Sequence, residues 1–191
     1  GAEVRIEDYP AEKGDWRKFV SDLKDFQPTA VLLVVTTATL ETDLQACRAA
    51  KDELGLSFFT IAKGEIFESM GEEILERWPE LDLGLYGESE PALAALVSGE
   101  AWENVPGLLF RKRSDRSDRS EGSDRKIIRT PKPKPIQNLD DLPLPARDLL
   151  KNELYLSPET GRPLAVIHGN RGCPAKCIFC PAGPVSNYTL R

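Results

Sequence analysis

Short apolar runs alternate with stretches of helical periodicity over the first hundred residues of the chain. Residues 30–35, 56–61 and 81–86 are runs of strand length, and a run that is apolar on both faces is typical of a parallel strand covered by helices. Residues 4–6 alternate in polarity and predict a further short strand before them. Strands that alternate with helices in this way predict right-handed crossovers and an α/β domain with an open, doubly wound parallel sheet.

Four segments carry apolar residues at the spacing of an amphipathic helix. They are residues 15–26, 40–54, 66–78 and 91–97. Gly55 is placed to end the second helix in the left-handed conformation, Pro79 stops the third, and Pro91 suits the first turn of the fourth. The same periodicity puts Cys47 and Met70 on the apolar faces of their helices, so Cys47 is expected to be a small core residue.

The pattern changes after residue 105. Residues 107–112 and 126–130 predict the two arms of a hairpin, and the residues between them are a near-repeat of Ser-Asp-Arg without an apolar side chain. Such a segment cannot bury enough surface to offset its ordering entropy, so a disordered insertion is expected there. These boundaries predict an α/β domain (1–112), the insertion (113–125), a hairpin return arm with an interdomain linker (126–162) and a last unit (163–191).

Composition narrows the class of protein. Of the 191 residues, 40% are hydrophobic and 29% are charged, which is typical of a globular chain. No apolar run reaches the roughly eighteen residues of a membrane span, and no signal peptide opens the chain, so a cytoplasmic protein is expected. The net charge of −6 argues against a general nucleic-acid surface, and aspartates interleave with the arginines of the insertion.

The candidate chemistry lies in three cysteines near the end of the chain. Cys173, Cys177 and Cys180 form a C-x3-C-x2-C pattern, and the only other cysteine is Cys47. Clustered thiolates hold zinc, copper(I) or an iron–sulfur cluster. A [4Fe-4S] cluster normally takes four protein thiolates, so three would leave one iron open to a ligand. Residues 163–168 are a short apolar run that predicts a strand, which would put the cysteines in the loop at its carboxyl end.

A structural zinc site is the main alternative for these cysteines. It would need a fourth ligand, and the only histidine, His168, lies on the predicted strand without a partner at finger-like spacing. A set of disulfides is disfavoured because an extracellular protein of this size would carry more cysteines at wider spacing.

The cysteine pattern resembles the cluster loop of the radical S-adenosylmethionine (radical SAM) enzymes, and the resemblance extends to the Asn-Arg-Gly triplet before it. It implies that Cys173, Cys177 and Cys180 hold a [4Fe-4S] cluster and that SAM binds the fourth iron of this cluster. Phe179 would then lie beside the adenine of SAM. It further implies cleavage of SAM to a 5′-deoxyadenosyl radical, with an electron donor of the flavodoxin or ferredoxin type. Residues 163–191 would begin a partial TIM barrel. The chain stops eleven residues after Cys180, so we expect a truncated barrel and an inactive isolated fragment.

The α/β domain is similar to the cobalamin-binding domain that precedes the barrel in one large radical SAM subclass. The order of strands and helices, the Gly-Glu-x-Glu element at residues 87–90 and the segment 138–148 carry this resemblance. It implies a Rossmann or flavodoxin-like fold with the corrinoid at the carboxyl ends of the strands, facing the cluster. The cofactor-binding residues would then include Thr36, Thr37, Gly64, Gly87 and Glu88. The alternative is a domain of the same fold that binds no cobalamin and only covers the barrel.

Together the resemblances imply cobalamin-assisted methyl transfer, or a related radical modification, on a small-molecule or natural-product substrate. The competing function is a non-catalytic α/β binding or sensor module with a structural iron–sulfur or zinc site. A four-ligand site that is indifferent to SAM would support the module, and an open iron that binds SAM would support the enzyme.

Overall fold

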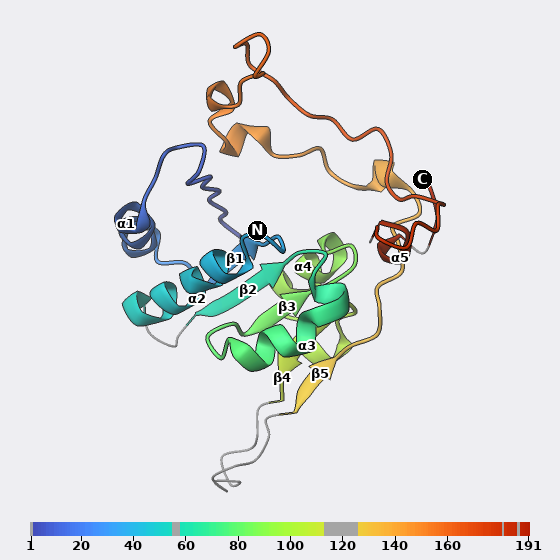
Figure 1. Cartoon of the computed structure of the whole chain (residues 1–191). Coiled ribbons are helices and arrows are strands. Elements are labelled where there is room, and N and C mark those ends of the chain that lie inside the picture. The colour runs from blue at the N-terminus through green and yellow to red at the C-terminus, as the bar shows by residue number, and fades with distance from the viewer. Residues whose placement is uncertain (1, 55–57, 113–125, 181, 187) are drawn as a thin grey trace, which may run out of the picture.

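The computed structural model of the chain describes residues 2–54, 58–112, 126–180, 182–186 and 188–191 (Figure 1). These residues form a five-stranded sheet whose strands lie in chain order. The first three are parallel and the last two are antiparallel to their neighbours. The α/β class with an open sheet is confirmed, but the sheet is mixed because the predicted hairpin continues it. The strands are β1 (Ala30–Val34), β2 (Phe59–Lys63), β3 (Leu83–Leu85), β4 (Leu108–Arg111) and β5 (Ile127–Arg129).

Helices cover both faces of the sheet, as a doubly wound fold requires. Helices α2 (Leu40–Leu54) and α3 (Phe67–Arg77) pack on one face, and α4 (Glu90–Val97) packs on the other together with Trp102. Helix α1 (Trp16–Phe26) packs mainly against α2. None of the helices in the described part of the chain is both long enough and apolar enough to cross a membrane.

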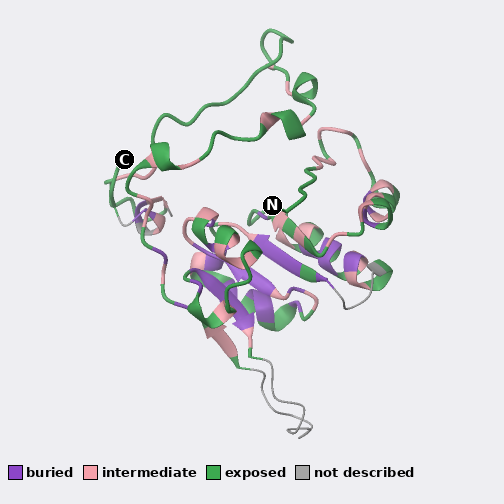
Figure 2. Ribbon diagram, turned by 180° about the vertical axis from the view of Figure 1, so that it is seen from behind, coloured by how far each residue is buried: buried purple, intermediate pink, exposed green. Residues whose placement is uncertain are grey.

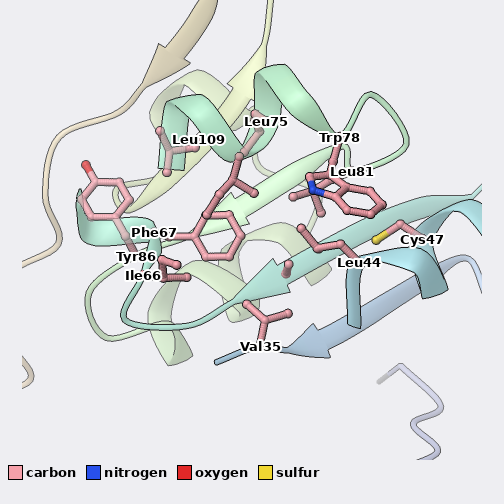
Figure 3. Close-up of a cluster of buried hydrophobic side chains, with 12 residues drawn as sticks. Val35, Leu44, Cys47, Ile66, Phe67, Leu75, Trp78, Leu81, Tyr86 and Leu109 are labelled. Carbon is pink, nitrogen blue, oxygen red and sulfur yellow. The ribbon is translucent and has the colours of Figure 1, made fainter. Parts of the chain in front are cut away.

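The main hydrophobic core lies between the sheet and the α2–α3 layer (Figure 3). Phe67 and Leu109 are fully buried there. Two glycines allow this close packing. A Cβ atom at Gly71 would lie 2.3 Å from the Leu109 side chain, and one at Gly84 would lie 2.8 Å from the Phe67 ring. Helix α3 therefore approaches strands β3 and β4 more closely than a larger residue at either position would permit.

Most predicted helices and strands agree with the observed ones to within three residues. The Asp15 side chain accepts a hydrogen bond from the Lys18 N–H and caps α1. The prediction for Met70 was wrong: its backbone is non-helical within α3, with φ −125° and ψ 19°, and its side chain is exposed. This kink breaks the periodicity on which the prediction relied. The predicted Gly55 cap and the 113–125 insertion lie outside the described residues.

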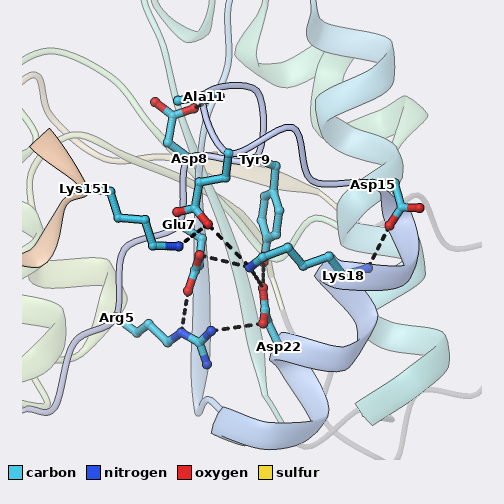
Figure 4. A network of polar contacts seen from close by, with 10 residues as sticks. Arg5, Glu7, Asp8, Tyr9, Ala11, Asp15, Lys18, Asp22 and Lys151 are labelled. Carbon is cyan, nitrogen blue, oxygen red and sulfur yellow. Dashed lines mark hydrogen bonds and ion pairs between the residues drawn. The ribbon is translucent and has the colours of Figure 1, made fainter. Parts of the chain in front are cut away.

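The predicted strand at residues 4–6 does not form in the described structure, and the segment runs extended beside α1 (Figure 4). Its charged side chains bind the helix. The Arg5 guanidinium donates to Asp22 at 3.0 Å, and Asp22 also accepts from Lys18 at 2.6 Å and from the Tyr9 hydroxyl at 3.0 Å. A strand needs a neighbour for its backbone groups, and here the side chains hold the segment instead.

Strand β1 is an edge strand of the described sheet, although its sequence predicted burial on both faces. Leu33 packs against the cores on the α2 side, whereas Leu32 and Val34 on the opposite face are exposed, Val34 by 68%. The physical reason is that α4 reaches only the later strands. The apolar run at residues 30–35 therefore predicted the strand correctly, but it did not predict how far each face is covered.

Residues 131–191 form an arm that leaves β5 and extends along the α/β domain with little regular structure (Figure 1). Figure 2 shows that the arm is largely exposed, whereas the sheet is largely buried. Residues 163–168, predicted as the first barrel strand, have only an isolated bridge at Pro163 within the described structure, because no strand lies beside them. The arm contains η3 (Leu139–Asp141), η4 (Arg147–Leu149), η5 (Asn152–Leu154) and α5 (Ala182–Val185).

Polar contacts attach the arm to the first turn of the chain. The Tyr155 hydroxyl donates to Asp8 at 2.8 Å, and Lys151 forms an ion pair with Glu12. These contacts join segments that are about 140 residues apart. The arm is thus held at a point well before the cysteines.

Candidate functional site

The three-cysteine segment is a closed loop, defined here as the cysteine loop, residues 171–191. Its two ends are joined by backbone hydrogen bonds. The Arg171 N–H donates to the Arg191 carbonyl at 3.0 Å, the Arg191 N–H donates to the Arg171 carbonyl at 2.9 Å, and an antiparallel bridge pairs Gly172 with Leu190. All three cysteines therefore lie in a segment whose base is fixed.

The base of the loop requires a glycine next to the first cysteine. Gly172 has φ +92°, and a Cβ atom there would lie 1.9 Å from the Thr189 carbonyl oxygen. The buried Ser186 hydroxyl accepts a hydrogen bond from the Cys173 N–H at 3.2 Å and donates to the Ala182 carbonyl at 2.7 Å. Ser186, directly after helix α5, thus holds the backbone of Cys173 in place.

The cysteines of the loop differ sharply from Cys47. All four cysteines are described and none forms a disulfide. Burial and the nearby acidic charges of Asp82 and Glu80 raise the pKa of Cys47 to about 12, so this core thiol stays protonated. In the loop, Cys173 and Cys180 are half-buried and Cys177 is exposed. Only the loop thiols are open to a ligand.

The three thiols lie on one short segment, but their side chains do not converge on a common position. Among the described residues, no three His, Cys, Asp or Glu side chains are arranged to hold a metal ion. The backbone turns between the last two cysteines, where the Cys180 N–H donates to the Cys177 carbonyl at 3.3 Å. Phe179, predicted to lie beside an adenine, is exposed on this turn. By donor chemistry the set fits an iron–sulfur cluster, since three unpaired thiols lie at accessible positions on one loop.

The predicted cofactor residues of the α/β domain lie at one end of the sheet, because the carboxyl ends of parallel strands share an edge. Thr36 and Thr37 are exposed after β1, and the Thr36 hydroxyl lies 2.9 Å from that of Thr39. Gly64 follows β2, and a Cβ atom there would lie 2.3 Å from the Val35 carbonyl oxygen. Gly87 follows β3 with φ +71°. The predicted residues after β1, β2 and β3 therefore lie along the same edge.

Glu88 joins this edge to the cysteine loop. Its carboxylate accepts hydrogen bonds from both terminal nitrogens of Arg191, at 2.5 and 3.2 Å, and from the Ile136 N–H at 2.8 Å. The Arg191 and Glu88 side chains are only 7% and 11% exposed. The Glu88 carboxylate, predicted to contact a cofactor, is thus occupied by the arm.

A second pair lies two residues further on. The Arg171 guanidinium donates to Glu90 at 2.7 Å. Burial alone would raise the pKa of the Glu90 carboxyl, but the hydrogen bond and charge of Arg171, with a contribution from Lys63, hold that pKa below its usual value. Sequence reasoning missed both pairs. The Glu-x-Glu spacing and the arginine before Gly172 were available as signals, whereas nothing local marked Arg191.

Two known proteins are similar to the chain over most of its length. No protein-family model matches the chain. Over 183 residues it is 27% identical to an uncharacterized methyltransferase of Pyrococcus horikoshii, covering 93% of this chain and 37% of that protein. Over 188 residues it is 29% identical to the hopanoid C-3 methylase of Methylococcus capsulatus, covering 95% of this chain and 33% of that enzyme. The chain is similar to methyltransferases. It spans about a third of the length of these two relatives.

Proposed function

We propose that the chain is the cofactor-handling part of a methyltransferase of the radical SAM class. The observation that carries the proposal is the cysteine loop, with three accessible thiols at C-x3-C-x2-C spacing on a base fixed by hydrogen bonds. The similarity to two methyltransferases over more than nine tenths of the chain supports the methyl-transfer part. In this proposal the substrate is a small molecule, and an external donor supplies the electron.

Each part of the loop has a role in this proposal. Cys173, Cys177 and Cys180 would hold a [4Fe-4S] cluster, which supplies an open iron and an electron for the reductive cleavage of SAM. Ser186 and Gly172 orient the backbone of the first cysteine. Phe179 offers an exposed aromatic face for stacking on adenine.

The strand-end loops of the α/β domain would face a second cofactor, cobalamin. Thr36 and Thr37 provide exposed hydroxyl groups at one edge of the sheet, where a large, flat ligand could lie across the carboxyl ends of the strands. Gly64 and Gly87 lie at the same edge, and the absence of a side chain there allows close packing against Val35 and Pro133. Glu88 belongs to the same edge but would act through its bonds to Arg191.

The test is anaerobic reconstitution with iron and sulfide, followed by electron paramagnetic resonance of the reduced protein with and without SAM. We expect a four-iron signal whose g-values shift on adding SAM. Single Cys→Ala variants at 173, 177 and 180 should each lose the signal. The matched control is Cys47→Ala, which also removes one thiol and should keep it. A four-iron signal indifferent to SAM, or zinc in place of iron, would contradict the proposal and support a structural site.

A further inference from the structure

Two arginine–glutamate pairs join the base of the cysteine loop to the segment between β3 and the start of α4. Arg171 and Arg191 lie opposite each other in the backbone pairing that closes the cysteine loop. Glu88 and Glu90 lie two residues apart after β3, and each binds one of the arginines. A single contact would leave the cysteine loop able to pivot, whereas two contacts at separate points fix its orientation.

The Arg191–Glu88 contact is a shielded ion pair with several hydrogen bonds, and in this it differs from an ordinary surface ion pair. Arg191 binds Glu88 through two nitrogens and also donates to the Ile136 carbonyl at 2.5 Å, while the Ile136 N–H donates to Glu88. Both charged side chains are almost completely shielded from solvent. A bidentate pair in such surroundings is geometrically selective, and removing one partner leaves a buried charge without compensation.

The Glu90 contact acts close to the first thiol. Arg171 lies two residues before Cys173, and the intervening Gly172 is packed against the Thr189 carbonyl oxygen. A displacement of Arg171 would therefore be transmitted to the backbone of Cys173. Glu90 is the first residue of α4, which follows β3, so the pair lies on the side of the sheet where the parallel strands end.

We propose that Glu88 and Glu90 are positioning residues that hold the cysteine loop against the carboxyl ends of the parallel strands. The identity of the cofactor carried by the loop rests on the function proposed above, but the docking does not. The two glutamates would set the direction in which the three thiols face. They would do so without contacting a cofactor themselves.

The first test is hydrogen exchange followed by mass spectrometry on the whole chain. Glu88→Gln keeps the shape and removes the charge, and we expect amide exchange in residues 171–180 to become at least about tenfold faster. Exchange in β2 and β3 should not change. The matched control is Glu41→Gln, which breaks the exposed Arg77–Glu41 pair and should leave the cysteine loop unaffected.

A conservative variant separates charge from geometry. Arg191→Lys keeps the positive charge but cannot make the two-nitrogen contact, so we expect an intermediate increase in exchange of the same segment. If Glu88→Gln also raises exchange in β2, the α/β domain itself has been disturbed, and Arg191→Lys then decides the question from the other partner. Unchanged exchange in residues 171–180 in both variants would overturn the positioning role.

The proposed docking of the cysteine loop and the proposed cofactor can be disproved independently of each other. Reconstituted Glu88→Gln should bind as much iron as the parent chain, because the three thiols are untouched. If the parent chain binds no iron but Glu88→Gln still loosens the cysteine loop, the proposed function fails and the docking stands. If the parent chain assembles a cluster that responds to SAM and neither variant changes the exchange, the reverse holds.

Discussion

The sheet and the arm of this chain both contain apolar runs, yet they use them in different ways. In the sheet, Leu83 and Leu109 are buried between helices on the two faces. In the arm, Ile167 and Ile178 are exposed, and polar contacts such as Arg191–Glu88 and Tyr155–Asp8 hold the chain. The α/β domain is therefore stabilised mainly by burial, and the arm by hydrogen bonds and ion pairs.

This difference shows that an apolar run becomes a strand only where neighbouring strands accept its backbone bonds. Residues 30–34 and residues 163–168 are both mostly apolar, but only residues 30–34 pair with another strand along their length. The second run bonds to other parts of the arm instead: the Leu164 N–H donates to the Tyr155 carbonyl at 2.8 Å, and the Val166 carbonyl accepts from the Arg147 guanidinium at 2.5 Å. A surface arm tolerates a run without a strand ladder because solvent is close by, and a core does not. The next experiments test how far the two regions depend on different forces.

The largest effect is expected in the main core. Phe67→Ala should lower the free energy of unfolding by about 3–5 kcal/mol, because the ring is fully buried between α3 and the sheet. Ile178→Ala in the arm should change it by less than about 0.5 kcal/mol, because that side chain is exposed. Urea unfolding followed by circular dichroism measures both. Comparable losses in the two variants would mean that the arm has an apolar core of its own.

A smaller loss is expected at the end of α3. The Arg111 guanidinium donates to the carbonyls of Trp78 and Leu81 at 2.8 and 2.7 Å, so Arg111→Met should cost about 1–3 kcal/mol by leaving these acceptors without their donor. Arg77→Met, at an exposed ion pair, is the control and should cost less than about 1 kcal/mol. Equal effects would indicate that polar contacts contribute little to the α/β domain beyond surface charge.

A third substitution should act on the arm alone. Gly172→Ala places a Cβ atom against the Thr189 carbonyl oxygen and forces a positive φ on alanine. We expect the base of the cysteine loop to open, with faster amide exchange at Cys173, while the urea midpoint of the α/β domain stays the same. Gly161→Ala is the control, since Gly161 has a positive φ in the arm but no atom near its Cβ position. A lower urea midpoint for Gly172→Ala would show that the two regions unfold together.

The smallest effect is a dependence on pH. The pKa of Glu90 is lowered in the folded chain, so the Arg171–Glu90 pair contributes stability above the ordinary glutamate value of 4.5 and loses it as the pH falls through the lower folded value. The pair is half-exposed, which limits the contribution to about 1 kcal/mol or less. A pH series of amide exchange in residues 171–180 should show loosening at acidic pH that is absent in Glu90→Gln. The same profile in both proteins would assign the effect to other carboxylates.

Local patterns predicted the helices well. The four segments with helical spacing correspond to α1, α2, α3 and α4, because capping residues and an apolar face act within a few turns. The hairpin of β4 and β5 was also predicted, since its arms are close in sequence. The parallel strands were placed with shifts of up to three residues, and the exposure of β1 was not predicted at all.

The sequence by itself determined the α/β class, the buried faces of the helices except at the Met70 kink, and the three thiols of the cysteine loop, because each depends on residues near one another in the chain. The tertiary structure decided which apolar runs found partner strands, and it decided that Arg191 would meet Glu88 across a separation of 103 residues. Strand pairing and buried ion pairs join distant segments, so their outcome depends on the packing of the whole domain. That packing is also what brings the cysteine loop to the end of the sheet.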